Sequence, residues 1–174
     1  NFPASITTTE LIQEIENLNR VPHMCGIIVQ LPLPDHIDKQ VVLDAILPTL
    51  DVDCLGTVAS EKFYNNENPT GFPTALACMR VLDEVETNLE GKNIVVLGRG
   101  TLVGKPVAHL IQAKNLSVTV VNSKTENADE IMKNADVIIS GIGKGKFITG
   151  DKIKEGAVII DAGTSEDNGR VIGN

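Results

Sequence analysis

The chain has 174 residues, 42% of them hydrophobic, which is enough for one or two domains with a buried core. Its 15 basic and 23 acidic residues give a net charge of −8, which argues against binding to nucleic acids or membrane surfaces. No apolar run reaches the about 18 residues of a membrane-spanning helix. Three cysteines without a CxxC pair predict free thiols rather than disulfides or a zinc site. We therefore expect a cytoplasmic protein without nucleic-acid, membrane or metal partners.

The first half of the chain combines helix signals with one short apolar run. Thr7 and Glu10 form a capping-box pattern, in which a hydroxyl and a carboxylate satisfy free amides at a helix start. The run over 26–30 is almost continuously apolar, as in a strand buried on both faces, and the prolines after it end the strand. The expected segments are helices over 8–19, 38–47 and 74–85, a strand over 26–30 and an irregular stretch over 50–72.

From residue 93 onward, strand patterns alternate with helix patterns. This alternation predicts a parallel sheet with right-handed crossovers. The change of pattern places a boundary near 86–91, so we expect one domain over 1–86 and a second over 87–174. The expected segments are strands over 93–97, 117–121, 136–140 and 157–161, helices over 102–114 and 126–134, and a helical turn over 151–154.

The most informative motif is a glycine triplet, Gly98-x-Gly100-x-x-x-Gly104, between an apolar strand and a helix. The first glycine permits a tight turn, the second lets the backbone approach a pyrophosphate, and the third permits close packing of helix and strand. The helix N-terminus then offers free amides to the phosphates. This context predicts a dinucleotide-binding site, and a tight turn without a ligand is the alternative.

The end of the next strand indicates which dinucleotide binds. NAD-binding proteins usually have an acidic residue about twenty positions after the first glycine, where it binds the ribose hydroxyls. This sequence has Asn122-Ser123-Lys124-Thr125 there, without a carboxylate. Arg99, Ser123 and Lys124 together suit a 2′-phosphate. We therefore predict NADP as the cofactor, with Arg99 and Ser123 as the main contacts, and a solvated turn is the alternative.

Several segments match the motifs of one known family, in the family's order. They are the run 26–34, similar to VQLPLP; residues 51–53, similar to KDVDG; the loop 98–106, similar to GRSxxVGxP; residues 123–125, similar to HSKT; and the segments 156–161 and 169–173. The chain thus resembles the bifunctional methylenetetrahydrofolate dehydrogenase/methenyltetrahydrofolate cyclohydrolase family. The resemblance implies two α/β domains flanking a cleft, with folate bound by residues 1–86 and NADP by a Rossmann-like, doubly wound parallel sheet in 87–174.

The resemblance also implies an activity and a set of site residues. The activity is oxidation of 5,10-methylenetetrahydrofolate by NADP, then hydrolysis of the methenyl product to 10-formyltetrahydrofolate, within one-carbon metabolism and purine biosynthesis. Gln30 and Asp53 would be the catalytic residues, with Asp53 binding the pterin ring, and Leu31 and Pro32 would complete the substrate site. A homodimer is expected as well. The cofactor contacts implied are Gly98, Arg99, Gly100, Gly104, Ser123 and Thr164.

The chain departs from the family pattern in several places. The residues that differ are Leu50 for lysine, Cys54 for glycine, Ala75 for proline, Gly100 for serine, Asn122 for histidine and Asn174 for aspartate. The family's tyrosine–lysine pair and its PVPGGVGP segment do not occur in the 174 residues. We therefore expect a chain truncated at both ends, with little cyclohydrolase activity if taken alone. The alternatives are another NADP-dependent dehydrogenase on the same scaffold, or an inactive cofactor-binding remnant.

Overall fold

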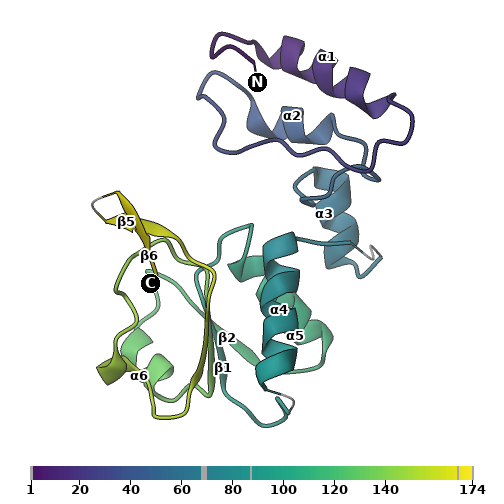
Figure 1. Cartoon of the computed structure of the whole chain (residues 1–174). Coiled ribbons are helices and arrows are strands. Elements are labelled where there is room, and N and C mark those ends of the chain that lie inside the picture. The colour runs from purple at the N-terminus through teal and green to yellow at the C-terminus, as the bar shows by residue number, and fades with distance from the viewer. Residues whose placement is uncertain (1, 68–69, 87, 168, 174) are drawn as a thin grey trace. The chain divides into compact units, whose positions relative to one another are not determined.

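The computed structural model describes residues 2–67, 70–86, 88–167 and 169–173. The chain divides into two compact units, one up to Pro73 and one from Thr74 onward. Figure 1 shows the second unit as a sheet with helices on both of its faces. In the described ranges, no helix is both long and apolar enough to cross a lipid bilayer.

The described residues of the first unit form the helices α1 (Thr8–Asn19), α2 (Lys39–Asp44) and α3 (Thr57–Tyr64). The predicted capping box at the start of α1 is confirmed. The Thr7 hydroxyl accepts a hydrogen bond from the Glu10 amide at 3.2 Å, and the Glu10 carboxylate accepts one from the Thr7 amide at 2.8 Å. The helices bury one apolar cluster made by Leu11, Ile15, Ile27, Ile37, Val42 and Ile46.

Three predictions for this unit need correction. The run over 26–30 forms only a single parallel bridge, between Ile27 and Asp51, and Ile28 is 66% exposed, so it is not a strand buried on both faces. Helix α2 ends at Asp44, earlier than predicted. The stretch expected to be irregular contains α3, because Ala59 and Phe63, one helical turn apart, bury a common face.

The second unit begins with α4 (Pro73–Val85) and continues with a four-stranded parallel sheet. All four predicted strands are confirmed, with bounds that differ by one residue at their starts. The elements that follow α4 are β1 (Ile94–Leu97), α5 (Gly104–Ala113), β2 (Val118–Val121), α6 (Ala128–Lys133), β3 (Val137–Ser140), the 3₁₀ turn η1 (Gly150–Lys152) and β4 (Val158–Asp161).

The strand order β2-β1-β3-β4 places β1 between the two strands that follow it. The chain moves from β1 to one side and then crosses to the other, so right-handed crossovers put α5 and α6 on opposite faces (Figure 1). Leu97 pairs in register with Val121 and with Ser140, and the three strands therefore end together. Ligands of such sheets bind beyond the carboxyl ends of the strands where the order reverses.

Two further features were not predicted from the sequence. A hairpin of β5 (Ser165–Asp167) and β6 (Arg170–Ile172) follows the sheet. The two compact units also meet between Pro73 and Thr74, at the start of α4, whereas the sequence pattern places the boundary near 86–91. One reason is the ion pair between Lys114 and Asp83, at 2.7 Å, which joins the end of α5 to α4.

Candidate functional site

The turn between β1 and α5 depends on two glycines that no other residue can replace, Gly98 and Gly104. Gly98 has φ of +97°, a left-handed conformation that side chains rarely adopt, and its amide donates to the Val121 carbonyl at 2.8 Å. A Cβ on Gly104 would collide with the Gly98 carbonyl, so α5 begins directly against the end of β1. A Cβ on Gly100 would meet nothing within 4 Å, which leaves its backbone open to a ligand. We call residues 98–104 the glycine loop.

The glycine loop leads into the N-terminus of α5. The Lys105 amide donates to the Gly100 carbonyl at 3.0 Å and closes the loop. Val103, the residue before the helix, provides no side-chain cap for the first amides. A helix start without a side-chain cap attracts anions, because its amides and dipole favour negative charge. Arg99 is exposed in the same loop and adds a cation.

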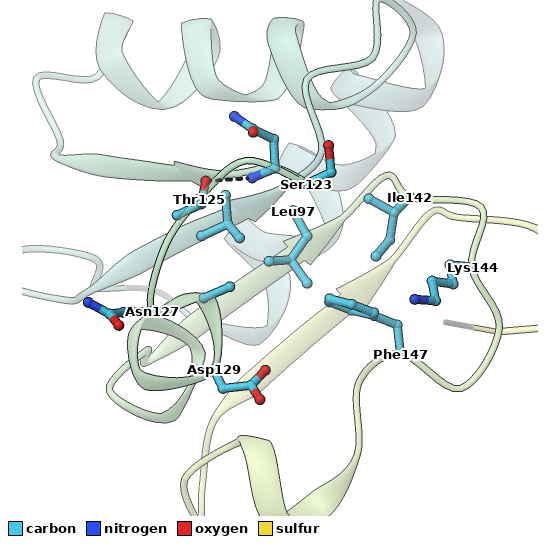
Figure 2. A pocket seen from close by; sticks show the side chains of 11 residues that line it. Leu97, Ser123, Thr125, Asn127, Asp129, Ile142, Lys144 and Phe147 are labelled. Atoms are coloured by element: carbon cyan, nitrogen blue, oxygen red, sulfur yellow. Dashed lines mark hydrogen bonds between the residues drawn. The ribbon is translucent and has the colours of Figure 1, made fainter.

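A cavity of about 640 Å³ lies at the carboxyl ends of the strands (Figure 2). We call it the strand-end cavity. Leu97, Ile142 and Phe147 give it apolar walls, and Ser123 and Thr125 add hydroxyls. The residues that line it come from the ends of β1 and β2, the turn after β2, the start of α6 and the loop after β3: Leu97, Val121, Asn122, Ser123, Thr125, Asn127, Ala128, Asp129, Ile142, Lys144 and Phe147.

The turn after β2 is held by its own side chains. The Thr125 hydroxyl accepts a hydrogen bond from the Asn122 amide at 2.9 Å, and the Asn122 side chain accepts one from the Lys124 amide, also at 2.9 Å. This Asx-type turn places Ser123 on the cavity wall, whereas Lys124 is exposed and does not line the cavity. No acidic residue lies within the turn.

The loop after β3, residues 141–149, contributes cavity residues that sequence reasoning missed. The Lys144 ammonium lies 5.3 Å and the Lys152 ammonium 5.1 Å from the centre of the Phe147 ring. Lys152 also pairs with Asp129 at 3.2 Å, which links η1 to the start of α6. The only signal in the sequence was a pair of cations flanking an aromatic residue, which is too common to identify a site.

The predicted cofactor residues do not all lie in one place. Ser123 lines the strand-end cavity, whereas Gly98, Arg99, Gly100 and Gly104 form the glycine loop above the end of β1. Thr164 precedes β5, and its carbonyl oxygen would lie 3.1 Å from a Cβ on Gly143. Thr164 therefore adjoins the loop after β3 and is not part of the cavity lining.

The predicted substrate residues all belong to the first unit. The Ile27 amide donates a hydrogen bond to the Leu50 carbonyl at 2.8 Å, and Ile27 forms a parallel bridge with Asp51. Gln30 and Asp53 come shortly after these two bridged residues in the sequence. The Gln30 side chain is exposed and donates to the Leu31 carbonyl at 2.8 Å. Leu31, which follows Gln30 in the sequence, is half-buried, and Pro32 is exposed.

Asp51 and Asp53 have different surroundings. Asp51 is buried, and its carboxylate accepts hydrogen bonds from the Gly56 amide at 2.7 Å and the Leu55 amide at 3.3 Å, so it stabilises the loop. Asp53 is half-buried, and in the described ranges its carboxylate has no hydrogen bond or ion pair. Burial raises the pKa of Asp53, and the neighbouring Asp51 raises it further. Asp53 is therefore available to a ligand.

Cys54 adopts a left-handed conformation next to these carboxylates, with φ of +59°. Burial, and then the nearby Asp51, raise the pKa of its thiol to about 11. Burial also raises the pKa of Tyr64 to about 12, which leaves its hydroxyl neutral beside Phe63 and Phe72. Neither group suits proton transfer near neutral pH. Among the described residues, no three His, Cys, Asp or Glu side chains cluster as metal ligands.

Comparison with known proteins yields matches over both units. Residues 72–174 match the tetrahydrofolate dehydrogenase/cyclohydrolase NAD(P)-binding domain, and residues 1–53 match the catalytic domain of the same family. The chain is 42% identical over its whole length to the bifunctional protein FolD of Clostridium novyi, of which it covers 63%.

Solved structures give the same result. The bifunctional enzyme FolD from Campylobacter jejuni superposes with a TM-score of 0.90 at 33% identity, over 98% of this chain and 61% of that one. The Trypanosoma brucei enzyme, solved with NADP cofactor and inhibitor, gives a TM-score of 0.87 at 35% identity, over 99% and 62%. The chain thus spans a little over three fifths of these relatives. It belongs to the tetrahydrofolate dehydrogenase/cyclohydrolase family, with the family's NAD(P)-binding domain in its second unit.

Proposed function

We propose that the protein oxidises 5,10-methylenetetrahydrofolate with NADP and hydrolyses the methenyl product to 10-formyltetrahydrofolate. The observation that carries the proposal is that the glycine loop begins directly after Leu97 and packs Gly98 against Ile142, two residues that line the strand-end cavity, at the point where the strand order reverses. The matches to both domains of one folate enzyme family support the substrate class. The chain spans only part of its relatives, so the proposal concerns the native protein that contains this chain.

The residues of the second unit fit NADP. The open backbone at Gly100 and the start of α5 would hold the pyrophosphate, and Gly98 and Gly104 allow that approach. Arg99 and Ser123 would hold the 2′-phosphate, because a guanidinium and a hydroxyl bind phosphate well and no carboxylate in the 122–125 turn repels it. When bound, NADP supplies the hydride acceptor. We place Thr164 as a backbone contact from the segment that adjoins Gly143.

The residues of the first unit fit a folate. The half-buried carboxylate of Asp53 would accept two hydrogen bonds from the donor edge of the pterin ring. Gln30 would position the substrate, and Leu31 and Pro32 would pack beside it. Hydride transfer needs no strong base, because holding the donor carbon near its acceptor supplies most of the rate effect. The hydrolytic step needs water activation and proton transfer.

We also infer a homodimer in the cytoplasm that supplies formyl groups for purine biosynthesis. Val81 and Val85 support an interface between copies, because they expose apolar surface one turn apart on α4. The three cysteines are free thiols, which supports a reducing compartment. Light scattering on the purified protein measures the mass directly, and a monomeric mass would contradict the homodimer.

Calorimetric titration tests the binding part of the proposal. NADP, NAD and tetrahydrofolate are titrated separately into the native protein. We expect NADP to bind more tightly than NAD, and tetrahydrofolate to bind whether or not NADP is present. Equal affinities for the two dinucleotides would contradict the assignment of Arg99 and Ser123. Absence of tetrahydrofolate binding would contradict the substrate class and would favour another NADP-dependent dehydrogenase.

A further inference from the structure

The loop after β3, residues 141–149, has no regular structure of its own, yet it forms one wall of the strand-end cavity. Ile142, Lys144 and Phe147 reach the cavity from this loop, as Figure 2 shows. Lys146 lies between them in a left-handed conformation, with φ of +58°. This conformation is unfavourable for a residue other than glycine, so neighbouring structure must hold it.

The β5–β6 hairpin holds this loop from one side. The Lys146 amide donates to the Gly173 carbonyl at 3.2 Å, directly after β6. Gly145 packs against the hairpin so closely that an added Cβ would lie 2.5 Å from the Ile172 Cδ1 atom and 2.8 Å from the Ser165 hydroxyl. The Ser165 hydroxyl in turn donates to the Ile172 carbonyl at 3.3 Å. This hydrogen bond joins the two hairpin residues that contact Gly145.

A second contact holds the far end of the loop. Lys152 pairs with Asp129 at 3.2 Å and lies 5.1 Å from the centre of the Phe147 ring. The end of the loop is thereby linked to α6, which also lines the cavity. A loop held at both ends keeps its wall residues in place without a ligand. The Lys152–Asp129 pair is partly exposed and contributes little free energy by itself.

We propose that the β5–β6 hairpin is a positioning element for the strand-end cavity, and that Gly145, Ser165 and Ile172 are its positioning residues. The hairpin acts through the 141–149 loop and sets the place of Lys144 and Phe147. The inference rests on the proposed function for the identity of the ligand, NADP. The contacts between hairpin and loop stand independently of that ligand.

The test adds a side chain at Gly145 and then shortens Ile172, with which the added side chain would clash. Gly145→Val pushes the loop away from the hairpin, and Ile172→Ala in the same chain makes room for the added side chain. Gly150→Val is the matched control, because it places the same side chain five positions later, where an added Cβ meets nothing within 4 Å. Ile172→Ala alone loosens the contact between the 141–149 loop and the hairpin without a steric clash. This variant replaces Gly145→Val in the test if Gly145→Val does not fold.

Two readouts are measured in the full chain. We expect Gly145→Val to weaken NADP binding about tenfold by calorimetry, with partial recovery in the double variant, because coupled neighbours do not act additively. Tetrahydrofolate binding should not change in any variant. Hydrogen exchange across 142–149 should rise in Gly145→Val and in Ile172→Ala, and should match the wild type in Gly150→Val.

The outcomes separate this inference from the proposed function. If the wild type does not bind NADP, the proposed function is wrong, and the exchange of residues 142–149 still decides whether the hairpin holds the loop. If the wild type binds NADP but Gly145→Val binds equally well, the positioning role is wrong. Unchanged exchange in both Gly145→Val and Ile172→Ala would overturn the hairpin contact itself.

Discussion

The carbonyl of Gly98 occupies the space that a Cβ on Gly104 would need. The strand end and the helix start therefore touch backbone to backbone, and only glycine at position 104 allows it. Gly100, between them, meets no such neighbour. Gly98 thus provides the turn and Gly104 the packing, and we propose that Gly100 lets a ligand approach the backbone.

Substitution at the two later glycines should separate stability from binding. Gly104→Ala forces the start of α5 away from β1, and we expect it to lower the free energy of unfolding by about 1–3 kcal/mol. Gly100→Ala should leave stability unchanged and weaken NADP binding roughly tenfold, equivalent to about 1.4 kcal/mol. Chemical denaturation and calorimetry measure the two effects. A stable Gly104→Ala chain would contradict the packing role.

Cofactor choice should depend on Arg99. Loss of a hydrogen bond to a charged group costs about 1.5–3 kcal/mol, so Arg99→Ala should weaken NADP binding by roughly ten- to a hundredfold. NAD lacks the 2′-phosphate, and its affinity should change little. Arg80→Ala is the control, because Arg80 is an exposed arginine on α4, paired with Glu84, to which no cofactor role is assigned. An equal loss for both dinucleotides would place Arg99 elsewhere than at the 2′-phosphate.

Folate binding should depend on the ionised form of Asp53. Its pKa is raised above 3.8, so on acidification the carboxylate takes up its proton at a higher pH than an ordinary aspartate. Affinity for tetrahydrofolate should therefore fall as the pH decreases towards the raised pKa of Asp53. Asp53→Asn should weaken folate binding at neutral pH, remove this component of the pH dependence and leave NADP binding intact. Full folate affinity in Asp53→Asn would show that the residue is wrongly assigned.

Acid stability should depend on Asp136. Its carboxylate accepts hydrogen bonds from Lys154 at 2.6 Å and from the Asn93 amide at 2.7 Å, and these lower its pKa. A lowered pKa in the folded state stabilises the protein above the unfolded pKa, and this stability is lost as the pH falls through the folded value.

Because the ion pair is partly exposed, we expect Asp136→Asn to lower the free energy of unfolding at neutral pH by about 1 kcal/mol. The difference from the wild type should shrink in acid. Urea denaturation at several pH values measures it, and a constant difference across the series would contradict the role of the charge.

Thiol reactivity should distinguish the three cysteines. Cys25 is exposed, whereas Cys54 and Cys78 are buried and burial raises the pKa of both thiols. Because the thiolate is the reactive form, a thiol reagent at mildly alkaline pH should modify Cys25 first. Mass spectrometry of the peptides identifies the site. Rapid modification of Cys54 in the native state would contradict its burial.

The sequence predicted the second unit better than the first, for a physical reason. Strands such as 94–97 and 137–140 are buried on both faces and are almost continuously apolar, and glycines mark the turn between β1 and α5. The run over 26–30 has the same composition, but pairing through the single Ile27–Asp51 bridge leaves Ile28 exposed. The amino-acid composition of a segment indicates that it can pair as a strand, but it does not indicate how many of its residues pair.

The candidate site was also only partly predictable. Glycine spacing located the loop at 98–104, and the polar turn located Ser123. Lys144 and Phe147 could not be found in this way, because a loop without periodicity positions them and the hairpin around Ile172 holds that loop. Such contacts depend on the tertiary structure, which leaves no regular pattern in the sequence.

Turnover by the native protein is the decisive measurement for NADP-dependent oxidation of 5,10-methylenetetrahydrofolate. The absorbance of reduced nicotinamide is followed with this substrate and either NADP or NAD. We expect reduction of NADP in preference to NAD, and loss of that preference in Arg99→Ala. A native protein that binds NADP but reduces neither dinucleotide would overturn the proposed oxidation and indicate a cofactor-binding protein without this activity.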